Sequence, residues 1–86
     1  MGEHTKGYKK KRHQQILDTV GKNILILRTQ KKFSVKKLAE LAEIEEKMLY
    51  NYERGLVDIS ASMIAILAEA LEVEPNTLLI SHSKQP

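Results

Sequence analysis

The stretch FSVKKLAELAEIEEKMLYNYERG, from Phe33 to Gly55, decides the fold. The apolar residues of its first half have the i, i+3, i+4, i+7 spacing of one buried helical stripe: Val35, Leu38, Ala39 and Ala42. The apolar residues of its second half share a second helical face, which we expect to lie on the core: Ile44, Met48, Leu49 and Tyr52. Because only a few residues separate the two patterns, we predict two short helices joined by a tight turn.

Residues that are typical of helix ends flank this helix pair. Ser34 can cap the first helix, because its hydroxyl accepts a hydrogen bond from a free backbone N–H. Gly55 supplies the left-handed residue that commonly ends a helix. The outer face of the second helix is polar and carries Glu46, Lys47, Tyr50, Asn51 and Arg54. Periodicity alone leaves the use of that face open.

Three further helices are predicted around this pair. Residues 14–29 have helical spacing, and Gly21 in their middle favours the close approach of a neighbouring helix. Ser60 can cap a helix that extends to Leu71. Pro75 suits the first position of a last helix at 76–80, whose Leu78 and Leu79 we expect to close the core. The prediction is an all-α domain of five helices.

Composition limits the class of protein. Eighty-six residues make one domain with a small core, and the absence of cysteine excludes disulfides and thiolate zinc sites. No apolar run approaches the ~20 residues that cross a bilayer, and the N-terminus lacks the apolar core of a signal peptide, so we expect a cytoplasmic protein. Residues 1–37 carry 11 Lys/Arg and 2 acids, whereas residues 38–86 carry 3 Lys/Arg and 9 acids. A polyanion would meet the N-terminal half first.

The predicted domain spans residues 14–80, between a basic segment at 1–13 and a patternless, disordered tail at 81–86. The basic run is Lys9, Lys10, Lys11 and Arg12. Two interpretations stay open for it: a solvated tail, or a flexible arm that follows phosphates. The three histidines at 4, 13 and 82 have no ligand spacing, so we predict no metal and no cofactor.

Residues 20–80 resemble the lambda-repressor-like helix-turn-helix family of the Cro and phage-repressor type, also called XRE. The residues that carry the resemblance are Val20, Gly21, Ile24, Leu27, Arg28, Ser34, Leu38, Ala39, Ala42, Ile44, Leu49, Glu53, Arg54, Gly55, Leu67, Ala68, Ala70, Leu71, Leu78 and Leu79. The chain departs from the family's pattern at three positions. Val35 replaces the usual Gln of the first motif helix, Glu43 replaces the turn Gly, and Glu45 replaces the Ser that starts the recognition helix.

The resemblance implies a transcriptional regulator of repressor type that reads the major groove with the helix around 45–54. The positions that match base-contacting sites of the family are Glu46, Lys47 and Asn51, with Tyr50 on the same face. The residues expected to contact phosphates are Ser34, Lys36, Lys37 and Arg54. The acids Glu43, Glu45 and Glu46 oppose this interpretation, because they would enter a region of strong negative potential.

Three classes of function are open to a domain of this kind. Sequence-specific binding of double-stranded DNA is the favoured one, and the alternative is a module of the same fold that binds a protein or forms dimers. An enzyme is not expected, because no nucleophile with an adjacent base can be assembled from these residues. We also expect a homodimer, joined through Ile66, Leu79 and Ile80 or through Leu25 and Ile26 on the first helix. Extra local packing is the other interpretation of Leu25 and Ile26.

Overall fold

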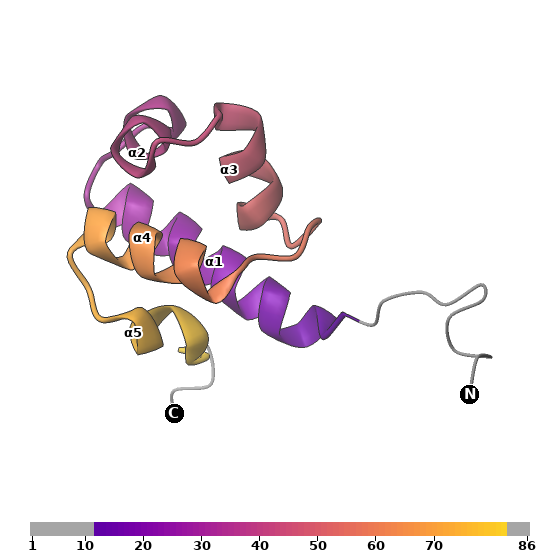
Figure 1. The fold of residues 1–86 in the computed structure, drawn as a ribbon. Helices are drawn as coiled ribbons and strands as arrows, with labels where there is room; N and C mark the ends of the chain where they lie inside the picture. Colours follow the sequence, from indigo (N-terminus) through magenta and orange to yellow (C-terminus); the bar gives the residue numbers. More distant parts are fainter. Residues whose placement is uncertain (1–11, 83–86) are drawn as a thin grey trace, which may run out of the picture.

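The computed structural model describes residues 12–82 of the 86, and these fold into five α-helices (Figure 1). Within this range there is no strand, so the predicted all-α class is confirmed. The helices are α1 (Gln14–Gln30), α2 (Val35–Ala42), α3 (Glu46–Glu53), α4 (Ala61–Leu71) and α5 (Pro75–Leu79). Two of the five follow a predicted capping serine, Ser34 and Ser60, and α5 begins at the predicted helix-starting proline, Pro75.

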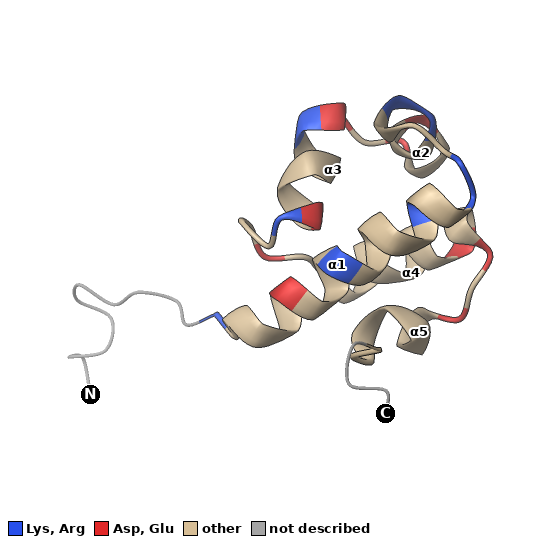
Figure 2. Ribbon diagram, turned by 180° about the vertical axis from the view of Figure 1, so that it is seen from behind, with Lys and Arg blue, Asp and Glu red and all other residues tan. Residues whose placement is uncertain are grey.

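The long helix α1 is the centre of the arrangement. It packs against α3, α4 and α5, while α2 packs against α3 and α4. Figures 1 and 2 both show α2 and α3 on one side of the α1 and α4 pair and α5 on the other side. The helix-turn-helix pair and the C-terminal helix therefore present separate surfaces.

Leucine side chains make most of the core. The largest fully buried side chains come from all five helices and are Val20, Ile24, Leu38, Leu49, Leu67, Leu71 and Leu78. Burying one leucine side chain stabilises a fold by about 1.5–3 kcal/mol. Since Leu38 and Leu49 belong to α2 and α3, this core fixes the helix pair to the rest of the domain.

Hydrogen bonds and backbone geometry define the helix ends. The hydroxyls of Ser34 and Ser60 accept hydrogen bonds from the backbone N–H groups of Lys37 and Met63 at 2.9 and 3.0 Å. Gly55 has the expected left-handed conformation, with φ of 70°. Glu43 occupies the turn between α2 and α3 with φ of 58°, which costs a side-chain-bearing residue about 1–2 kcal/mol. The turn therefore forms without the glycine that is usual there.

Gly21 permits the close contact between α1 and α3 that its position predicts. A Cβ atom built on Gly21 would lie 2.6 Å from the carbonyl oxygen of Glu53, in the last turn of α3. Even alanine at this position would force the two helices apart. Gly21 therefore sets how close α3 lies to α1.

Two predicted core residues are exposed. Leu79 is 40% exposed, because α5 has only five residues and directs Leu78 alone into the core. Met48 is also 40% exposed, because it lies about 100° around α3 from Leu49, the one buried residue of that helix. The prediction that both side chains are buried is wrong. Stripes on such short helices are narrow, and residues at their edges reach solvent.

Candidate nucleic-acid interface

The start of α2 carries three of the predicted phosphate contacts. Ser34, Lys36 and Lys37 are all exposed. The Ser34 hydroxyl accepts from the Lys37 N–H, which leaves its own proton free to donate. Among residues 12–82, the ammonium groups of Lys36 and Lys37 form no ion pair. A helix N-terminus with two unpaired lysines beside it is suited to hold a phosphate.

The outer face of α3 brings together the four residues predicted to contact bases. Glu46, Lys47, Tyr50 and Asn51 have i, i+1, i+4 and i+5 spacing, which places them on one side of the helix. The first three are exposed and Asn51 is partly buried. The Asn51 amide has no hydrogen-bond partner in the part of the chain that the structure describes. Its donor and its acceptor are therefore both available to a ligand.

Arg54 lies against Tyr50 at the C-terminal end of α3. The central carbon of its guanidinium group is 4.4 Å from the centroid of the Tyr50 ring. A cation–π contact of this kind at an exposed site contributes about 0.5–1 kcal/mol. It holds the positive charge of Arg54 on the same face as the four predicted base contacts. The i, i+4 spacing in the sequence signals such a pair, although we did not predict it.

A buried ion pair fixes the relative positions of α1, α2 and α3. The Nε atom of Arg28 donates to Glu53 Oε2 at 2.7 Å, and a second guanidinium nitrogen donates to Oε1 at 3.3 Å. A third donates to the carbonyl oxygen of Phe33, just before α2, at 2.9 Å. The two charged side chains are only 12% and 6% exposed. Neither charge reaches the outer face, so this pair positions the interface without taking part in it.

Acidic residues lie beside the basic ones. Glu43, Glu45 and Glu46 are exposed, and none of them forms an ion pair within residues 12–82. Figure 2 shows basic and acidic segments next to each other at the end of α3 nearest α2. Residues 12–82 contain nine Lys/Arg and ten Asp/Glu, so the net positive charge of the chain comes from residues 1–11 and Lys84. General attraction to a polyanion thus depends on the N-terminal segment.

The N-terminal segment is only partly described. Lys9, Lys10 and Lys11 lie outside the described residues. Arg12 is the first described residue, and its guanidinium donates to the carbonyl oxygen of Leu56 at 3.1 Å and to the Gln14 side chain at 3.3 Å. Arg12 is therefore held by the folded domain, next to the loop that follows α3. At the other end of the chain, residues 83–86 of the predicted tail also lie outside the described range.

The histidines of the described part of the chain have structural contacts. The Nδ1 atom of His13 accepts a hydrogen bond from the Ile16 N–H, and Nε2 of His82 lies 3.2 Å from the carbonyl oxygen of Thr77. No group of three or more His, Asp or Glu side chains in residues 12–82 could hold a metal ion. In the same range, no helix is long and apolar enough to cross a membrane.

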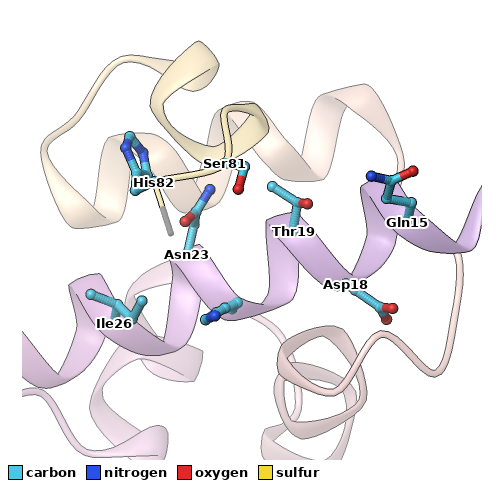
Figure 3. Close-up of a pocket in the computed structure, with 8 residues that line it drawn as sticks. Gln15, Asp18, Thr19, Asn23, Ile26, Ser81 and His82 are labelled. Atoms are coloured by element: carbon cyan, nitrogen blue, oxygen red, sulfur yellow. The ribbon is translucent and has the colours of Figure 1, made fainter. Parts of the chain in front are cut away.

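Parts of the two predicted dimer surfaces lie close together on the side of α5. Ile26 of α1 lines a cleft of about 290 Å³ with Ser81 and His82, which follow Ile80 directly (Figure 3). Asn23, one turn before Ile26, donates to the carbonyl oxygens of Leu78 and Ile80 at 2.9 Å each. The apolar side chains predicted for dimer contact are all 37–50% exposed: Leu25, Ile26, Ile66, Leu79 and Ile80. Ile26 of the first-helix candidate thus lies close to the residues that directly follow Ile80 of the C-terminal candidate, which the sequence did not reveal.

Comparison with known families identifies the class of this domain. Residues 21–80 match the family model described as "Helix-turn-helix domain", which covers more than half of the chain. The chain therefore belongs to the helix-turn-helix domain family. The predicted resemblance to lambda-repressor-like regulators is confirmed.

Individual relatives have the names of regulators. The chain is 36% identical over 59 residues to an uncharacterized HTH-type transcriptional regulator of Rickettsia conorii. This match covers 69% of the chain and 47% of the relative, and a match to a protein of Methanothermobacter thermautotrophicus covers only 17% of that relative. The chain thus spans half or less of the length of these curated relatives.

Two solved structures agree with this chain over nearly their whole length. The restriction-modification controller protein C.AhdI from Aeromonas hydrophila has a TM-score of 0.70 and 35% identity, over 72% of this chain and 94% of that one. SinR, the master regulator for biofilm formation, was crystallised in complex with DNA. It has a TM-score of 0.67 and 31% identity, over 71% of this chain and 98% of that one. The five-helix arrangement is therefore that of known regulators.

Proposed function

We propose that this chain is a sequence-specific DNA-binding transcriptional regulator that inserts α3 into the major groove. The observation that carries the proposal is the exposed polar face of α3, with the unpartnered amide of Asn51, beside the two unpaired lysines at the start of α2. Family membership and the regulator names of the relatives support it. The crystallisation of SinR in complex with DNA supports it further, because SinR has the same arrangement of helices.

The residues of α3 have separate roles in this proposal. The Asn51 amide can bond an adenine through two hydrogen bonds, and the Lys47 ammonium can donate to guanine O6 and N7. The carboxylate of Glu46 can accept a hydrogen bond from a cytosine amino group, which gives one of the three exposed acids a favourable contact. Tyr50 presents its ring to the groove on the same side. Together these contacts select a sequence.

Contacts to phosphates set the register of α3 on the duplex. Ser34, Lys36 and Lys37 hold a phosphate at the start of α2, and Arg54 holds another near the end of α3. Val35 lacks the amide that glutamine would offer to the backbone at this position. The flanking lysines therefore supply more of this attachment. Lys9, Lys10 and Lys11 add contacts to the backbone outside the groove that α3 occupies.

The regulator acts as a homodimer in this proposal. One recognition helix reads only a few base pairs, and a dimer places two such helices on half-sites about 34 Å apart. Ile26 of α1 lines a cleft with the two residues that directly follow Ile80, and α5 lies on the other side of the α1 and α4 pair from α2 and α3 (Figure 1). A contact through Ile26, Leu79 and Ile80 therefore leaves the DNA-binding side free.

The exposed acids favour a second candidate function. Glu43, Glu45 and Glu46 would suit a helix pair that binds a basic protein surface instead of a polyanion. In that case the same fold serves as a protein-interaction or dimerisation module. The two functions differ in what removal of the basic residues on α2 should do. It should weaken binding to DNA, but it should not weaken binding to a basic protein surface.

A salt titration with two variants tests the proposed function. A plot of log K against log salt has a negative slope for DNA binding. In Lys36→Gln/Lys37→Gln, the loss of two phosphate contacts should make that slope shallower by up to about 1.8. Lys22→Gln is the control, because Lys22 is an exposed lysine of α1 that lines the cleft on the α5 side. It should leave the slope within about 0.5 of the wild type. Duplex binding that is unchanged in the α2 variant would refute this role of α2.

A further inference from the structure

The contact between Tyr50 and Arg54 differs from the other cation–π contact in the described part of the chain. The Nζ atom of Lys31 lies 5.8 Å from the centroid of the Phe33 ring, but it also pairs with Glu72 at 3.0 Å. Arg54 is closer to its ring, at 4.4 Å, and its guanidinium has no ion pair or hydrogen bond with any described residue. Among the described residues, the Tyr50 ring is therefore the group that holds the charge of Arg54.

The acidic residues next to Arg54 in the sequence leave its charge free. Two guanidinium nitrogens of Arg28 donate to the Glu53 carboxylate at 2.7 and 3.3 Å, and the Glu53 side chain is only 6% exposed. Asp58 is exposed in the loop after α3 and forms no ion pair with a described residue. The exposed positive charge of Arg54 is therefore not neutralised within the described part of the chain.

A guanidinium group that lies over an aromatic ring keeps donors for a further ligand. The group is planar, and its five N–H bonds lie in that plane, so the donors that point away from the ring stay free. Tyr50 is 47% exposed and Arg54 is also exposed, so a phosphate oxygen can reach these donors while the ring stays in contact. A free arginine side chain samples many rotamers, and the ring restricts them. The contact therefore orients the group before a phosphate binds.

We propose that Tyr50 is a positioning residue for DNA binding, whose ring holds the Arg54 guanidinium in place for the phosphate backbone at the C-terminal end of α3. The inference rests on the proposed function, in which Arg54 contacts a phosphate. Tyr50 acts through Arg54, in addition to presenting its own ring to the groove. A merely structural role of Tyr50, in which it only covers the surface of α3, would leave the contribution of Arg54 unchanged.

The test measures how much of the contribution of Arg54 depends on the ring. Binding of a selected duplex is measured for the wild type and for Arg54→Gln, and again for Arg54→Gln in the backgrounds Tyr50→Leu and Tyr50→Phe. Leucine is a good helix former and removes the ring, whereas phenylalanine keeps the ring and removes only the hydroxyl. Lys47→Gln is the matched control in the same backgrounds, because Lys47 is exposed on the same face of α3 and contacts no described ring.

We expect Arg54→Gln to make the slope of log K against log salt shallower by up to about 0.9, because one phosphate contact is lost. The factor by which Arg54→Gln weakens binding should be about two- to fivefold smaller in the Tyr50→Leu background, as the strength of an exposed cation–π contact implies. In the Tyr50→Phe background the wild-type factor should return, because the ring is present. Lys47→Gln should weaken binding by the same factor in all three backgrounds.

Four results would overturn the inference. An Arg54→Gln variant that binds as tightly as the wild type would show that Arg54 makes no DNA contact, and equal losses in the wild-type and Tyr50→Leu backgrounds would show that Arg54 acts without the ring. A Tyr50→Phe background that behaves like Tyr50→Leu would assign the effect to the hydroxyl. A Lys47 factor that falls as much as the Arg54 factor would show that Tyr50→Leu disturbs α3 as a whole. These results leave the proposed function standing, whereas a wild type that binds no duplex at low salt would remove both.

Discussion

Asn51 is the residue whose chemistry most directly decides whether α3 reads a base. It is partly buried at the edge of the exposed face of α3, and its amide has no partner among residues 12–82. The substitution Asn51→Ala should cost about 1–3 kcal/mol on the preferred site and little on random DNA. Asn76→Ala is the control, because Asn76 is exposed on α5. Competition binding checks this, and an equal loss on both kinds of DNA would contradict the base contact.

The sequence predicts some of the side-chain hydrogen bonds and ion pairs in this structure but not others. The caps Ser34 and Ser60 follow from local spacing, because each bonds a backbone group only three residues away. Arg28 and Glu53 are 25 residues apart, and no local pattern indicates that they form a buried ion pair. Asn23 is similar, because its partners at Leu78 and Ile80 lie more than 50 residues along the chain. Such contacts depend on how the helices pack, so the local sequence does not predict them.

Contact between α1 and α3 determines the position of α3. Alanine in place of glycine usually stabilises a helix by about 1 kcal/mol. Here Gly21→Ala should lower the free energy of unfolding by about 1–3 kcal/mol, because its Cβ meets backbone carbonyl oxygens of Tyr52 and Glu53 that cannot rotate away. Urea denaturation checks this, with the exposed neighbour Lys22→Ala as control, expected within about 0.5 kcal/mol of wild type.

A stability of Gly21→Ala equal to or above that of the wild type would contradict the close contact.

At this scale the sequence predicts the elements well, because helical spacing defines α1, and apolar spacing and a capping serine coincide in α2 and α4. It fails for Met48 and Leu79, which belong to helices of eight and five residues. Such short helices have too few apolar positions to define which side of a stripe is buried.

The whole molecule has one side with α2 and α3 and another with α5 (Figure 1). Because Ile26 lines a cleft with the residues that follow Ile80, we expect Ile26→Glu and Ile80→Glu both to weaken a dimer of the chain. Leu41→Glu is the control, because Leu41 is 46% exposed on α2. Sedimentation at micromolar concentration measures the effect. A wild type that stays monomeric, both free and on a palindromic duplex, would rule out the dimer.

The central claim, that α3 reads a DNA sequence, is tested most directly by selecting duplexes from a random pool with the wild-type chain and titrating the selected duplex with salt. We predict enrichment of one motif, bound at least a thousandfold more tightly than random DNA, with an affinity that falls steeply as salt rises. A pool that shows no enriched motif after selection, together with binding that does not respond to salt, would contradict the account.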